Sequence, residues 1–238
     1  MPQLKPGSPF LYDDVTGDVI GLRDADGGDT FFAAPRYTFA QMKALTGMAD
    51  GQLVTVTNYP AGKGSTWRYS ATFGDWFPVG PCKVYENTAL ITGLAQAADQ
   101  LLLAIPVEAG LIANKVFRLL VSFGKSGTTD ASGTFSLRMG TAGTTADGQV
   151  ASASGSLAAG NRTTSFDFWN RMASPTSLNK LGSTPSVGFT NGSSGTVLNA
   201  ATVVPNVATQ ATYISLTTTM GGATDTPQLG YVALEIQP

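Results

Sequence analysis

The chain from residue 82 onward is a succession of short alternating segments separated by turn residues, and this pattern restricts its fold most strongly. Residues 116–123 read Val-Phe-Arg-Leu-Leu-Val-Ser-Phe, and residues 134–139 read Thr-Phe-Ser-Leu-Arg-Met. Apolar side chains at nearly every second position are expected of strands that bury one face. Glycine-containing turns such as 145–148 and 221–222 separate these segments. The pattern predicts a mainly β fold.

Ten segments of this region have strand character, and their Ser, Thr, Gly and β-branched residues disfavour helices. Eight to ten strands over about 155 residues predict a two-sheet sandwich with a jelly-roll-like arrangement. The predicted strands are 83–86, 89–94, 100–105, 114–123, 133–140, 149–156, 162–172, 186–190, 208–220 and 229–237.

The first 81 residues predict a small N-terminal domain with one short helix and a β-meander. Thr38 is a suitable N-cap, residues 39–45 have helical apolar spacing, and Gly47 is a suitable stop. The predicted strands that follow are 52–58, 65–71 and 76–77, with Trp67, Tyr69 and Trp76 as their core. Two prolines within residues 77–81 indicate a linker. We therefore expect domains at 1–81 and 82–238.

Charge is scarce in this chain and unevenly placed. Charged residues make up 13% of the sequence, against about 25% in ordinary soluble domains. Residues 1–81 carry 8 acidic and 6 basic side chains, whereas residues 82–238 carry 8 of each. The first thirty residues hold six aspartates and several glycines, so they form an acidic arm that needs another surface to lie on.

The composition excludes several classes of function. The sequence has no histidine and one cysteine, Cys82, which leaves no Ser-His-Asp or Cys-His catalysis and no cysteine-rich zinc site. A net charge of −2 and a pI near 5.0 argue against nucleic-acid binding. The longest apolar stretch, 101–123, is interrupted by charges and a proline, so no membrane partner is expected. A lone cysteine suits synthesis in a reducing cytoplasm.

Two motifs suggest a ligand but are better explained as turns. Residues 62–65 read Gly-Lys-Gly-Ser, yet the glycine that opens a phosphate-binding loop is missing and Gly64 follows the lysine in place of Ser or Thr, so a hairpin turn is favoured. Residues 24–29 resemble the start of a calcium loop, but Gly28 and Pro35 stand where ligands are required. We expect no metal and no cofactor.

Paired carboxylates are the catalytic device that the missing histidines leave open. A glycosidase needs two acids that flank one groove. The acids of the large domain are scattered over predicted turns and strands, and nothing in the sequence proposes a pair. Those considered, mostly in predicted turns, are Asp99, Glu108, Asp130, Asp147, Asp167, Asp225 and Glu235. We expect no catalytic residues, with a carboxylate-based glycan hydrolase as the weaker alternative.

Residues 166–171, Phe-Asp-Phe-Trp-Asn-Arg, are the candidate for ligand contact. If exposed, Asp167, Trp169, Asn170 and Arg171 could bind a glycan, with the ring on the apolar sugar face and the polar groups on its hydroxyls. The favoured interpretation is structural, with Phe166 and Phe168 facing the core and Trp169 partly buried.

Two groups of residues resemble virion structural proteins of tailed bacteriophages, especially small fibre and decoration proteins. Residues 49–58, followed by 64–69 and 74–77, are similar to a short module near the front of tail-fibre-type proteins. Residues 103–106, 110–112 and 116–123, with Leu137-Arg-Met-Gly-Thr-Ala-Gly-Thr144, resemble the jelly-roll modules at the ends of such chains.

The resemblance implies a non-enzymatic virion protein that is a homotrimer. Residues 1–81 would attach to another virion protein, and the jelly roll would face outward, in a tail fibre somewhat more than in a head fibre or capsid decoration. A lectin-like module that binds a host surface glycan is the main alternative. The absence of heptads and of 20–50-residue repeats implies that any fibre is short.

Overall fold

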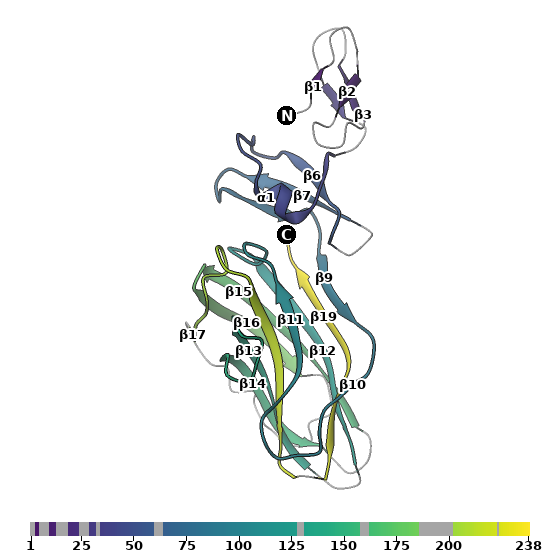
Figure 1. Cartoon of the computed structure of the whole chain (residues 1–238), viewed down its shortest axis with the longest axis vertical. Coiled ribbons are helices and arrows are strands. Elements are labelled where there is room, and N and C mark those ends of the chain that lie inside the picture. The colour runs from purple at the N-terminus through teal and green to yellow at the C-terminus, as the bar shows by residue number, and fades with distance from the viewer. Residues whose placement is uncertain are drawn as a thin grey trace. The chain divides into compact units, whose positions relative to one another are not determined.

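Two compact units make up the chain, Met1–Cys82 with Pro238 and Lys83–Gln237. The boundary predicted from the sequence lies after residue 81. The computed structural model describes residues 3–4, 10–12, 19–23, 29–31, 34–59, 64–127, 131–157, 162–185, 202–222 and 224–238. The predicted strand at 186–190, the carboxylate Asp130 and most of the two turn motifs, 24–28 and 60–63, lie outside these residues. Both units are built mainly from β-strands (Figure 1).

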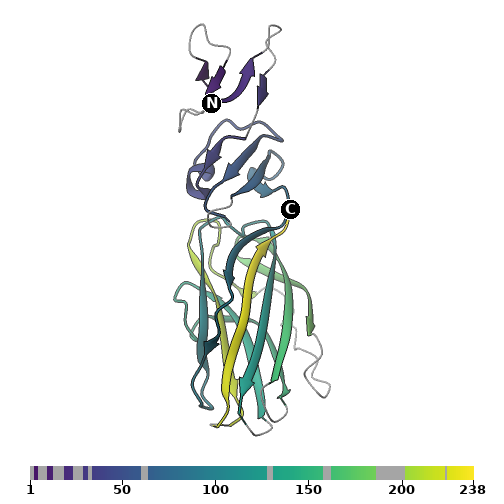
Figure 2. The ribbon, with the colours of Figure 1, turned by 90° about the vertical axis from the view of Figure 1, so that its right-hand side faces the viewer.

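The larger unit is a jelly roll, which confirms the predicted fold class. Its eight principal strands fall into two four-stranded sets, β10-β19-β12-β15 and β11-β18-β13-β14. Numbered along the chain, these are 1-8-3-6 and 2-7-4-5, the strand order of a jelly roll. Figure 2 shows β19, in yellow, between strands from earlier in the unit. The strands are β10 (Ile91–Thr92), β11 (Gln100–Val107), β12 (Val116–Ser126), β13 (Ala131–Gly140), β14 (Gly148–Leu157), β15 (Arg162–Ser174), β18 (Thr212–Met220) and β19 (Thr226–Ile236).

Three further strands widen the first sheet. β9 (Cys82–Asn87) pairs with β19, while β16 (Ser177–Pro185) pairs with β15, and β17 (Thr202–Val203) pairs with β16. Neither β16 nor β17 was predicted from the sequence. β12 also continues past its predicted end at residue 123, to Ser126.

The core of the jelly roll follows the predicted alternation. On β12, Phe117, Leu119, Val121 and Phe123 are buried, and the residues between them are half-buried. Because successive side chains of a strand point to opposite faces, the first set lines the inside of the sandwich. An aromatic cluster of Phe123, Phe135, Phe166 and Phe168 joins the two sheets at its centre.

Within the described residues, the smaller unit contains two four-stranded sheets and one helix. One sheet has the order β1-β2-β3-β4 and the other β5-β6-β7-β8. In the second sheet, β5 runs parallel to β6 and the remaining pairs are antiparallel. The elements are β1 (Gln3–Leu4), β2 (Phe10–Tyr12), β3 (Val19–Arg23), β4 (Asp29–Phe31), β5 (Arg36–Tyr37), α1 (Phe39–Lys43), β6 (Leu53–Val56), β7 (Ser65–Ser70) and β8 (Asp75–Pro78).

The core beside α1 differs from the predicted one in one residue. Trp67 and Trp76 are buried as expected, whereas Tyr69 is half-buried, with its ring edge against Trp76. Phe39 and Met42 of α1 and the two valines of β6 complete this core. The helix therefore covers one face of the β5–β8 sheet.

Thr38 caps the helix as the sequence predicts. Its hydroxyl accepts a hydrogen bond from the Gln41 backbone N–H (3.3 Å), and the Gln41 side chain accepts one from the Thr38 backbone N–H (2.8 Å). This reciprocal pair is a capping box. The helix ends at Lys43, two residues before the predicted end, and Gly47 then adopts a positive φ of 69°.

Loss of the cap should weaken the smaller unit. We expect Thr38→Ala to lower its free energy of unfolding by about 1 kcal/mol, since two backbone N–H groups depend on the capping box. Thr38→Ser keeps the hydroxyl and should stay within about 0.5 kcal/mol of the wild type. Urea unfolding, followed by tryptophan fluorescence, measures the difference. Equal losses in both variants would contradict the role of the hydroxyl.

Cys82 is buried against the polar group of Ser65. Its thiol donates to Ser65 Oγ (3.2 Å), which also accepts from the Trp67 indole N–H (2.8 Å) and donates to the Tyr59 carbonyl oxygen (2.6 Å). Burial raises the pKa of the Cys82 thiol, and the hydrogen bond with Ser65 opposes this shift. The thiol is therefore held neutral in the folded chain.

This raised pKa predicts a loss of stability in mild alkali. Below the unfolded pKa of about 8.5 both states bind the proton, and Cys82 adds no pH dependence. Above it, the unfolded chain releases the proton first, so stability falls by up to about 1.4 kcal/mol per pH unit until the folded thiol also titrates. Urea unfolding of the wild type and of Cys82→Ala at pH 7.5 and 9.5 tests this. An identical pH slope in both would contradict it.

Candidate functional site

The candidate ligand residues lie on β15, and alternation divides them between two faces. Phe166 and Phe168 are buried inside the sandwich, which confirms the structural interpretation of these two residues. Asp167 and Trp169 are half-buried and Arg171 is exposed, so these three side chains share the outer face of the jelly roll.

Asn170 requires a correction. It was grouped with its neighbours as a glycan contact, but its side chain is 1% exposed and lies on the Phe168 side of the strand. Its amide donates to the Phe168 carbonyl oxygen at 3.4 Å. Because Asn170 is two residues from Phe168, strand alternation places it in the core, where it cannot contact a ligand on the outer face.

Arg118 of β12 contacts the candidate residues on the outer face of the jelly roll. Its register partners are Trp169 on β15 and Glu235 on β19, so the three residues form one row across the sheet. The guanidinium binds Asp167 through two hydrogen bonds, Nε to Oδ1 and Nη2 to Oδ2, both 2.9 Å. Its Nη1 lies 3.6 Å from Glu235 Oε2, and its Cζ lies 5.2 Å from the centre of the Trp169 ring.

These contacts keep the guanidinium charged and in place. The hydrogen bonds with Asp167 raise the pKa of Arg118, partial desolvation opposes them, and the charges of Asp167 and Glu235 raise it further. A bidentate pair fixes the plane of the guanidinium as well as its position. The row therefore presents an indole, a fixed cation and two carboxylates on one surface, which are groups that can bind hydroxyls and an apolar sugar face.

Arg118 and Glu235 could not be predicted as part of this site, because their contacts are distant along the chain. Arg118 and Asp167 are 49 positions apart, and no local motif links them. The available signal was an arginine at an outward position of a strongly alternating strand.

Most of the acids once considered for catalysis have structural partners. Asp99 binds Arg138 at 2.8 Å, and Asp225 forms a buried ion pair with Lys125 at 3.0 Å. The Asp147 carboxylate accepts backbone N–H groups of residues 142, 143 and 144 at 3.2, 2.8 and 3.1 Å and so holds the β13–β14 turn. Asp167 and Glu235 flank the same guanidinium, and both Asp167 oxygens already accept from it.

No protein-family model matches the chain, and no curated protein matches it either. Among the described residues, no three His, Cys, Asp or Glu side chains come together as a metal site. Over the same part of the chain, no helix has the length and apolar character needed to cross a bilayer.

Proposed function

We propose that this chain is a non-enzymatic structural protein of a tailed-bacteriophage virion. It is a short fibre or appendage, on the tail somewhat more than on the head, that attaches by residues 1–81 and displays a trimeric jelly roll. The observation that carries the proposal is the strand order of the larger unit, because jelly rolls recur in viral shell proteins.

The pairing of charged side chains within the jelly roll also supports assembly. Arg118, Lys125 and Arg138 are each paired with a carboxylate of the same unit. Residues 82–238 carry no net charge, so copies of this unit would not repel one another. Neutral, internally paired surfaces suit close packing between subunits.

Solution mass and virion content together test the proposal. We expect sedimentation at micromolar concentration to give three times the 24.6 kDa mass of the chain. Peptides of the chain should also appear in purified virions of the phage that encodes it. Deletion of residues 2–30 should remove the chain from particles while the jelly roll stays folded. A monodisperse monomer, or virions that lack the chain, would contradict the proposal.

A glycan-binding role is the second candidate, favoured by the row of Trp169, Arg118 and Glu235. The ring and the carboxylates offer the stacking surface and acceptors that a sugar needs. A glycan array probed with the full chain tests this role. The affinity for a glycan found in this way should fall at least about tenfold in Trp169→Ala. Trp169→Phe should retain most of the affinity, because an aromatic face remains. An array without hits would contradict the role.

A further inference from the structure

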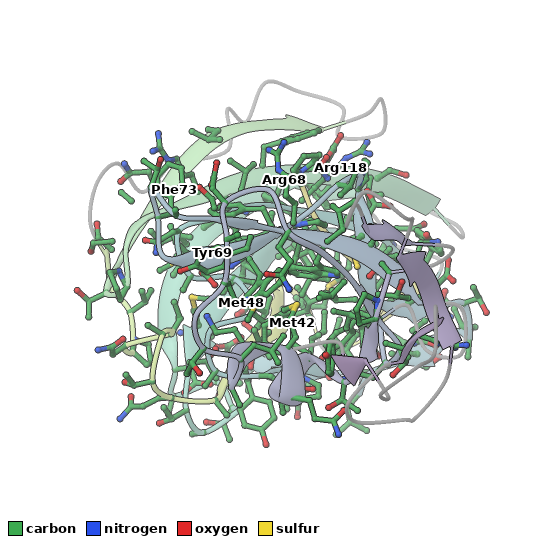
Figure 3. The ribbon with its side chains drawn as sticks, turned by 90° about the horizontal axis from the view of Figure 1, so that it is seen from above. Met42, Met48, Arg68, Tyr69, Phe73 and Arg118 are labelled. Carbon is green, nitrogen blue, oxygen red and sulfur yellow. The ribbon has the colours of Figure 1, made fainter. Side chains whose placement is uncertain are left out.

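Helix α1 covers one face of the β5–β8 sheet, and apolar side chains are exposed on the other face. Leu53, Arg68 and Phe77 are register partners across β6, β7 and β8, so they form one row on this second face. Val79 and Thr66 extend the next row, where Val79 N–H bonds to the Thr66 carbonyl oxygen. In Figure 3 the labelled Met42 lies by the helix, and the labelled Arg68 and Phe73 lie away from it. We call this surface the outer face of the β5–β8 sheet: Arg36, Leu53, Arg68, Phe73, Phe77 and Val79.

Three apolar side chains on this face of the β5–β8 sheet are largely exposed. Leu53 is 46% exposed, Phe73 60% and Val79 55%. Phe73 comes from the β7–β8 hairpin, and its ring lies 5.3 Å from that of Phe77, which gives it a fixed place on the sheet. Contiguous exposed apolar side chains on a soluble protein indicate an interaction surface.

The positive charge on the outer face of the β5–β8 sheet indicates what kind of partner can bind there. Arg36 and Arg68 are both exposed and form no ion pair within the described residues, and no acidic side chain lies in their two rows. A partner must therefore supply apolar side chains together with carboxylates.

The first 31 residues of the chain have this chemistry. They contain six aspartates against Lys5 and Arg23, and their strands carry apolar residues such as Phe10, Leu11 and Ile20. β1–β4 are strands of two to five residues, and such a short sheet needs a packing surface to be stable.

We propose that the outer face of the β5–β8 sheet is the docking site for the β1–β4 segment, residues 3–31, of a neighbouring copy of this chain. The inference rests on the trimeric assembly proposed above. Each copy then gives its segment to the next, and a head-to-tail contact of this kind closes into a ring when three copies are related by a three-fold rotation. Docking of the segment on its own chain is the alternative outcome of the test, because it would leave assembly unchanged in the variants below.

Charge and apolar variants of the full chain test the docking site. Arg68→Glu and Phe73→Ser should each raise the concentration of half-assembly by at least about tenfold in sedimentation experiments. Arg68→Lys keeps the charge and should assemble more strongly than Arg68→Glu. Leu90→Ser is the matched apolar control, because Leu90 is 62% exposed but lies in the other unit. Far-UV circular dichroism confirms that each variant is folded.

Charge exchange identifies the occupant. Replacement of Asp13, Asp14 and Asp18 by lysine should weaken assembly of the wild type and restore assembly of Arg68→Glu. A purely structural role of Arg68 would give no such rescue. If the wild type assembles and Arg68→Glu and Phe73→Ser assemble equally well, the docking site is wrong while the assembly stands. If the wild type is a monomer at every concentration, the proposed assembly fails, and this inference fails with it.

Discussion

Replacing Lys125 by methionine is expected to lower the stability of the jelly roll by about 3 to 5 kcal/mol. The Lys125 ammonium and the Asp225 carboxylate lie 3.0 Å apart, and their side chains are 0% and 1% exposed. Removal of the lysine charge leaves a buried carboxylate without that partner, and burying an ionised group is costly. The Gly127 backbone packs closely on this carboxylate, since a Cβ added there would lie 1.8 Å from Asp225 Oδ1.

The matched control is an exposed ion pair in the same unit. Lys83 and Glu86 also pair, but their side chains are 34% and 42% exposed, so Lys83→Met should cost less than about 1 kcal/mol. The double variant Lys125→Met with Asp225→Leu removes both charges and should recover part of the loss. Urea unfolding, followed by far-UV circular dichroism, measures all four proteins. A cost below 1 kcal/mol for Lys125→Met would contradict a stabilising role of the pair.

Strand alternation explains how much of the fold could be predicted from sequence. On β12 every second residue is apolar, so both the strand and its buried face could be predicted. β16 lacks that pattern, since Ser177-Leu-Asn-Lys-Leu-Gly-Ser-Thr-Pro185 contains a glycine, a proline and two leucines out of alternation. It is a strand because β15 offers a long ladder, with register shifts along it. Tertiary pairing decides such segments, and single-sequence patterns do not record it.

The outer face of β15 could be predicted only in part, for the same reason. The local sequence contains Asp167, Trp169 and Arg171, and strict alternation would have removed Asn170 from the group. Arg118 and Glu235 reach the row through pairings of β12 with β15 and with β19. Similarly, the buried pairing of Lys125 with Asp225 spans 100 positions, so no local pattern indicates it.

Phe135→Ala is expected to cost about 3 to 5 kcal/mol, as deletion of a buried ring usually does. Phe135 is fully buried on β13, in the sheet opposite β12 and β15. Its ring stacks on Phe166 at 5.3 Å with an interplanar angle of 6°, and its centroid lies 5.1 Å from Phe123 and 6.3 Å from Phe168. Loss of this ring removes contacts to three rings of the other sheet and leaves a cavity between the layers.

Two comparisons separate the ring contacts from simple loss of volume. Phe135→Leu retains much of the buried apolar surface but not the stacking, so it should cost clearly less than Phe135→Ala yet remain measurable. Phe77→Ala removes a ring of the same size from a half-buried position in the other unit and should leave unfolding of the jelly roll unchanged. Differential scanning calorimetry, which resolves the transition of the jelly roll, measures these effects. If Phe135→Ala were no worse than Phe135→Leu, the cluster would not be what holds the two sheets together, and burial outside it would have to account for their packing.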